Sequence, residues 1–196
     1  DFDTTLSPSD RDALILSHLP GSHVQKIAGR KVIIHEGIAL LRKQITHLGH
    51  PWPGFKKRIQ IPKIWLEQFD ELTSEALQPK FIGVYTYGAT CIFVDFEPST
   101  YLARKANNSA AHVSTNDLYQ AQIHGIFERT DRNGNALRAV RADLFETYLT
   151  QGVRTTDPRV EVFRELNANL LNDEIIDGLT AIKEMHSANW PDTFQS

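Results

Sequence analysis

The stretch from Lys80 to Leu118 constrains the fold more than any other part of the sequence. It contains two apolar runs joined at residues 87–90, Tyr-Gly-Ala-Thr, a pattern that predicts two strands connected by a tight turn. Because side chains alternate across a strand, Phe93, Asp95 and Glu97 are expected on one face of the second strand. Two carboxylates that end an apolar strand are costly to bury unless a cation lies beside them.

Helix and strand patterns surround this hairpin. Apolar periodicity and capping residues predict helices at residues 10–19, 35–48, 62–76 and 143–148, from 157 to 170, and at 173–185. Further strands are expected at 31–34, 57–61, 119–129 and 136–141, with loops at 98–100 and 107–109.

These elements predict an α+β fold with a central mixed β-sheet of hairpins, flanked by N-terminal and C-terminal helices. We expect one domain over residues 1–196. Its parts would be a helical N-terminal part at 1–50, a strand-rich centre at 55–141 and a helical C-terminal part at 142–190.

Charge and composition narrow the function classes. A formal net charge of -3 weighs against a binder that relies on overall positive charge, although 56–58 and 104–105 are local basic groups. The single cysteine, Cys91, excludes a disulfide framework. No apolar run approaches the roughly 20 residues of a membrane span, and no signal peptide is visible, so a cytoplasmic protein without a membrane partner is expected.

Asp95 and Glu97 are the first candidates for catalysis. Carboxylates are the ligands that Mg²⁺ prefers, and a bound Mg²⁺ can polarise a phosphate and activate water, so both residues are candidate catalytic and metal-binding groups. His112 is a further catalytic candidate, as a general base or a phosphate contact. The alternative is a solvated strand end at which the two acids pair with Arg104 or Lys105.

The polar segment after the hairpin is a candidate for DNA binding. Asn side chains can read adenine edges, while Lys and Arg contact guanine or phosphates. The candidate residues are Arg104, Lys105, Asn107, Asn108, Ser109 and Asn116. The alternative is a turn-rich loop whose Asn and Ser side chains satisfy their own backbone.

Residues 91–101, CIFVDFEPSTY, resemble the catalytic strand of the PD-(D/E)XK nuclease superfamily, in which an acid, one residue and a lysine end a hydrophobic strand. The resemblance implies a type II restriction endonuclease that is dimeric and depends on Mg²⁺. The sequence departs from the motif in two places. Glu97 occupies the lysine position, and Pro79-Lys80 replaces the upstream proline-acid pair, so Asp70, Glu71 or Glu75 would have to supply the missing acid.

The first hypothesis is therefore a sequence-specific double-stranded DNA endonuclease that hydrolyses phosphodiesters with Mg²⁺. The second is a non-catalytic DNA-binding module, similar to the pseudobarrel domains fused to some restriction enzymes, in which the acids are structural. A third is an interaction or regulatory protein without a nucleic-acid role. Discrete plasmid fragments that form only with Mg²⁺ would select the first.

Overall fold

The computed structural model describes residues 4–102, 108–130, 134 and 136–152. A mixed sheet of seven strands forms its centre, and β3 and β6 are its parallel pair among the described strands. The strands, in spatial order, are β1 (His23–Ile27), β2 (Arg30–His35), β3 (Ile38–Gln44), β6 (Gln78–Tyr87), β7 (Thr90–Phe96), β10 (Ala136–Arg141) and β9 (Ile126–Thr130).

A small antiparallel sheet covers one face of the large one. Its strands, in spatial order, are β4 (Thr46–His47), β5 (Lys56–Pro62) and β8 (Asn108–Ser114). Three helices share this side, namely α2 (Lys63–Ser74), α3 (Ser99–Leu102) and α4 (Thr115–His124). Ile59 and Val113 of the small sheet pack in one apolar core with Phe81 and Val94 of the large sheet. Because side chains alternate along β5, one row is buried against the large sheet and the other row faces away from it.

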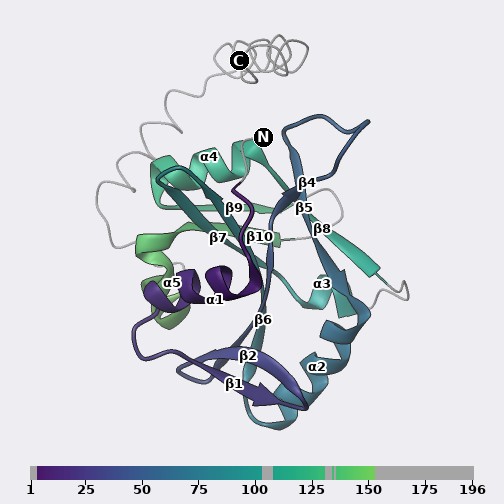
Figure 1. The fold of residues 1–196 in the computed structure, drawn as a ribbon, viewed down its shortest axis with the longest axis vertical. Helices are drawn as coiled ribbons and strands as arrows, with labels where there is room; N and C mark the ends of the chain where they lie inside the picture. Colours follow the sequence, from purple (N-terminus) through teal and green to yellow (C-terminus); the bar gives the residue numbers. More distant parts are fainter. Residues whose placement is uncertain (1–3, 103–107, 131–133, 135, 153–196) are drawn as a thin grey trace.

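The opposite face of the large sheet is covered by α1 (Pro8–Ser17), the short 3₁₀ helix η1 (Ala142–Leu144) and α5 (Phe145–Gln151). In Figure 1, α1 and α5 lie on the left of the molecule, and β5 and β8 lie on the right. The rings of Phe93 and Phe145 are 4.4 Å apart between centroids, so β7 and α5 share this second core.

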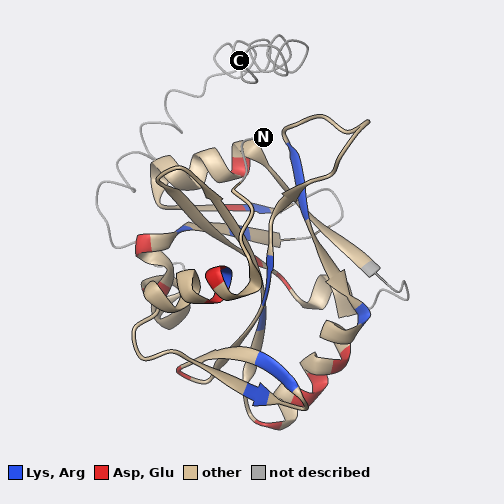
Figure 2. Cartoon of the chain, in the orientation of Figure 1, with Lys and Arg blue, Asp and Glu red and all other residues tan. Residues whose placement is uncertain are grey.

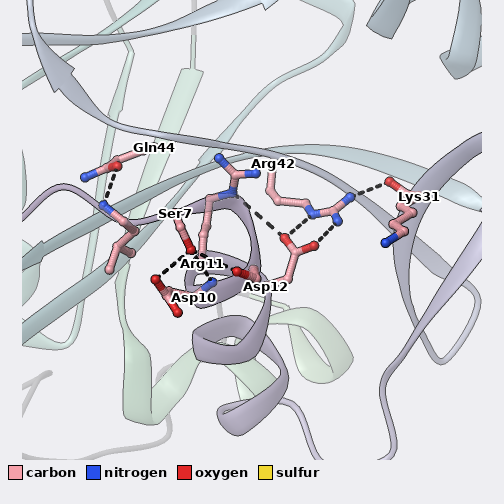
Figure 3. A network of polar contacts seen from close by, with 9 residues as sticks. Ser7, Asp10, Arg11, Asp12, Lys31, Arg42 and Gln44 are labelled. Carbon is pink, nitrogen blue, oxygen red and sulfur yellow. Dashed lines mark hydrogen bonds and ion pairs between the residues drawn. The ribbon is translucent and has the colours of Figure 1, made fainter.

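An ion pair fixes α1 to the same face. Arg42 of β3 donates to both carboxylate oxygens of Asp12, at 2.8 and 2.5 Å, and to the backbone carbonyl of Lys31 (Figure 3). The bidentate geometry sets the position of the helix along β3, while apolar side chains such as Ile15 supply the buried area.

The α+β prediction is confirmed, and so are the central hairpin, the strands at 57–61 and 136–141, and the helices at 10–19, 62–76 and 143–148. The helices expected from 157 onwards lie outside the described residues. In the described part of the chain the strands form open sheets and no closed barrel. No described helix is long and apolar enough to cross a membrane.

Four local predictions are wrong. Residues 35–48 form β3 and β4 instead of a helix, so the N-terminal part is not mainly helical. Residues 119–124 belong to α4, and the strand begins only after Gly125. The expected loops at 98–100 and 107–109 overlap α3 and the start of β8. In each case tertiary burial or a helix cap overrides the local pattern.

Candidate functional site

Asp95 lies in the middle of the large sheet, on the face covered by α5. Its side chain is 3% exposed. Oδ2 accepts a hydrogen bond of 2.5 Å from Nζ of Lys80 on β6 and one of 2.6 Å from the hydroxyl of Tyr148 on α5. Arg138 of β10 stands opposite Asp95 in the strand register. We call Lys80, Asp95, Arg138 and Tyr148 the Asp95 cluster.

The Asp95 cluster is electrostatically balanced. Lys80 neutralises the buried carboxylate, and Arg138 pairs with Glu128 of β9 at 2.8 Å. Burial, together with the negative charge of Asp95, raises the pKa of the Tyr148 hydroxyl well above its ordinary value. Tyr148 is therefore a protonated donor at neutral pH, and the cluster satisfies a buried charge as a structural site would.

Glu97 makes different contacts from Asp95. It follows β7 directly and is half-buried, and its Oε1 accepts from the hydroxyl of Ser99 at 3.1 Å. The three acids proposed as substitutes for the missing upstream acid, Asp70, Glu71 and Glu75, belong to α2 or the residue after it. Because α2 packs on the other face of the sheet, the fold does not bring them to Asp95.

The residues of the Asp95 cluster do not fit a Mg²⁺ site as they are arranged. A cation that binds Oδ2 of Asp95 would have to displace both donors, and one of them is itself positively charged. Within the described ranges no group of three or more His, Cys, Asp and Glu side chains is arranged to hold a metal ion.

His112 is also separated from Asp95. It is exposed on β8, which lies on the opposite side of the large sheet from α5. The structure therefore does not bring the three predicted catalytic residues together.

The predicted DNA-binding residues lie only partly within the described residues. Arg104, Lys105 and Asn107 lie outside the described residues, and Asn108 is described only as the first residue of β8. Ser109 is 7% exposed and points into the core. Asn116 is exposed in the first turn of α4.

The outward side of the small sheet has a different character. Its side chains come from alternating positions of three strands, and we call this surface the outer face: Thr46, Lys56, Arg58, Gln60 and His112. Arg58 lies between Thr46 and His112 in the strand register. Figure 2 shows the basic start of β5, with the acidic residues of α2 further along the chain. Each side chain of the outer face can donate a hydrogen bond, and none is a carboxylate.

The sequence carries a signal for the outer face in the distribution of its acidic residues, outside the recognised motifs. The residues from Gly37 to Leu66 contain no Asp or Glu, although the whole chain has 24 acidic and 21 basic residues. The net charge of -3, which sums over the whole chain, hides this local excess of basic over acidic residues. The basic group at 56–58 was visible, but its role depends on strand alternation, because Lys57 points inward and is 4% exposed.

Comparison with known proteins gives one match. A family model described as methylase-associated X1 matches residues 36–149, which is more than half of the chain and runs from before β3 into α5. The matched region contains both the Asp95 cluster and the outer face. No curated protein and no solved structure matches the chain.

Proposed function

Because the chain belongs to the methylase-associated X1 family, we propose that it is a DNA-binding component of a restriction-modification system. The family description supplies the restriction-modification context. DNA binding is inferred from one observation, the outer face, on which Lys56, Arg58 and His112 stand beside hydroxyl and amide donors in a region free of acids.

Phosphate contacts explain why such a surface suits DNA. Lys and Arg that meet phosphates release counterions, and this supplies much of the affinity of a DNA-binding protein. Thr46 and Gln60 add neutral donors of the kind that position a backbone. A chain with an overall negative charge can still bind through one such face, because salt screens exposed charges beyond roughly 10 Å.

The test is a salt titration of binding to labelled duplex DNA. Lys56→Ala with Arg58→Ala should weaken binding and reduce the slope of log K against log salt by about 2, since each lost phosphate contact removes about 0.9. Lys26→Ala with Lys31→Ala, on the exposed β1–β2 hairpin, is the matched control because it removes the same charge elsewhere. Equal losses in the two double variants, or no binding by the wild type, would contradict the proposal.

A second candidate is the dimeric restriction endonuclease. The observation that favours it is the 2.5 Å contact between Lys80 and Asp95, because the lysine missing from the strand motif reaches the acid from the neighbouring strand. The cluster as arranged does not fit Mg²⁺ at Oδ2 of Asp95, because Lys80 and Tyr148 already donate to that oxygen. Mg²⁺-dependent plasmid cleavage that Asp95→Asn abolishes would favour the endonuclease over the binding component.

A further inference from the structure

The loop between β4 and β5 presents an aromatic ring beside the outer face. Trp52 stands between Pro51 and Pro53, and 51% of its surface is exposed. Lys56, the first residue of β5, places its Nζ 4.9 Å from the centroid of the Trp52 ring. The ring and the basic residues of the outer face are thus joined through Lys56.

The side chain of His47 holds this loop in shape. Its Nδ1 accepts a hydrogen bond from the backbone N–H of Gly49 at 3.0 Å, and its Nε2 lies 3.1 Å from the carbonyl oxygen of Pro53. Both contacts are satisfied when Nε2 carries the ring proton and donates it to Pro53. One histidine therefore ties the start of the loop to its end.

Backbone constraints complete the loop. The N–H of Trp52 donates to the carbonyl of Gly49 at 2.9 Å, and the N–H of Lys56 donates to that of Pro53 at 3.0 Å. Proline fixes the backbone φ angle on both sides of the tryptophan. An exposed ring on a constrained backbone loses little conformational freedom when it meets a ligand, so the loop is preorganised for contact.

We propose that Trp52 stacks on an unpaired base while the outer face holds the adjoining phosphates, so that the site prefers DNA with a locally exposed base over fully paired duplex. This inference rests on the proposed function. In a duplex the faces of internal bases are covered by their neighbours, whereas an unpaired base offers its face to an aromatic ring. Lys56 lies over the ring of Trp52 and can also reach a phosphate beside the stacked base.

The test compares three labelled DNAs of the same length: a single strand, a fully paired duplex and a duplex with one central unpaired base. Wild-type protein should bind the DNAs with unpaired bases about tenfold more tightly than the full duplex. Trp52→Ala should remove this preference by weakening the binding of the two DNAs with unpaired bases far more than that of the full duplex, while Trp52→Tyr should retain part of it. Tyr119→Ala is the control, since it removes another exposed ring, one from α4.

The outcomes separate the two proposals. If the wild type binds no DNA, both fall. If it binds DNA through Lys56 and Arg58 but Trp52→Ala changes all three affinities equally or not at all, only the stacking inference is overturned. A melting curve of each variant confirms the fold. If Trp52→Ala misfolds, Trp52→Tyr and Trp52→Phe decide: a reduced preference for unpaired bases supports stacking, and an unaltered preference opposes it.

Discussion

The hydroxyl of Tyr148 donates a 2.6 Å hydrogen bond to the carboxylate of Asp95, which joins α5 to the centre of the sheet across 53 residues of sequence. Lys80 donates to the same oxygen, so a lysine and a phenol together satisfy one buried charge. The acid that most suggested catalysis in the sequence therefore has a structural explanation. Its partners come from other elements that the local strand pattern does not reveal.

The first prediction concerns this hydrogen bond. Tyr148→Phe should lower the free energy of unfolding by about 1.5–3 kcal/mol, because a buried carboxylate loses one of its donors. Urea denaturation at neutral pH measures the change. Tyr119→Phe is the matched control: Tyr119 is 60% exposed, and the loss of its hydroxyl should cost less than about 0.5 kcal/mol. A Tyr148→Phe variant as stable as the control would show that Lys80 alone suffices for Asp95.

The second prediction uses the single cysteine. Burial raises the pKa of the Cys91 thiol from 9.0 to about 11. The unfolded chain then loses the thiol proton at a lower pH than the folded chain, so the contribution of Cys91 to stability is present below pH 9.0 and is lost as the pH rises towards about 11.

Cys91→Ala should therefore flatten the decline of unfolding free energy above pH 9.0. Urea titrations at several alkaline pH values measure it. The folded wild type should also react slowly with thiol reagents at neutral pH, because little thiolate is present. Rapid labelling without unfolding would show that the thiol is not protected as the structure indicates.

The third prediction contrasts two neighbouring lysines. The Nζ of Lys57 lies 5.4 Å from the ring centroid of Tyr85 on the inner side of β5, whereas Lys56 is exposed on the outer face. Lys57→Ala should lower the melting temperature and leave the salt dependence of DNA binding unchanged. Lys56→Ala should leave the melting temperature unchanged and reduce the slope of log K for DNA binding against log salt by about 0.9. If both variants affect binding alike, the proposed orientation of β5 towards DNA is wrong.

The fourth prediction concerns the start of α4. Asp117 is 1% exposed, receives two hydrogen bonds from Arg129, at 2.9 and 3.0 Å, and completes a capping box with Ser114. Asp117→Ala should cost about 2–4 kcal/mol, because it removes two charge-assisted hydrogen bonds from Arg129 and leaves a helix end unsatisfied. Asp143→Ala breaks an exposed pair with Arg141 and should cost at most about 1 kcal/mol in the same denaturation assay.

Strongly amphipathic segments were predictable from the sequence. Residues 62–76 carry Trp65 and Leu72 at helical spacing, and both side chains face the core in α2. The central hairpin combines two β-rich runs with a glycine turn, and it forms with the expected alternation of Phe93 and Asp95 against Val94. In these segments local propensity and tertiary burial agree.

Segments buried on both faces were not predictable in this way. Residues 38–41 are all buried, so β3 presents a continuous apolar run instead of an alternating one, and such a run also fits a helical stripe. The Asp95 cluster could not be predicted from the sequence for a different reason. Lys80 and Tyr148 reach Asp95 only through sheet pairing and helix docking, and neither is encoded in the spacing around the acid.

The last prediction tests the junction at which α4 ends and β9 begins. Gly125 has a φ of 84°, and a Cβ added there would lie 2.4 Å from Cδ1 of Leu144. Gly21 has a similar φ of 78°, with no atom within 4 Å of its added Cβ. Both substitutions by alanine place a Cβ at a positive φ, which costs on the order of 1–3 kcal/mol; Gly125, with a ψ of -48°, lies outside the left-handed helical region.

Gly125→Ala should cost a further 1–3 kcal/mol, roughly, from steric overlap with Leu144. Combining it with Leu144→Ala should recover the steric part but not the backbone part, because the side chain that clashes is then removed. Urea denaturation of Gly125→Ala, Leu144→Ala and the double variant separates the steric cost from the backbone cost. Equal costs for Gly125→Ala and Gly21→Ala would mean that Leu144 moves aside without penalty and that η1 does not pack tightly against the end of α4.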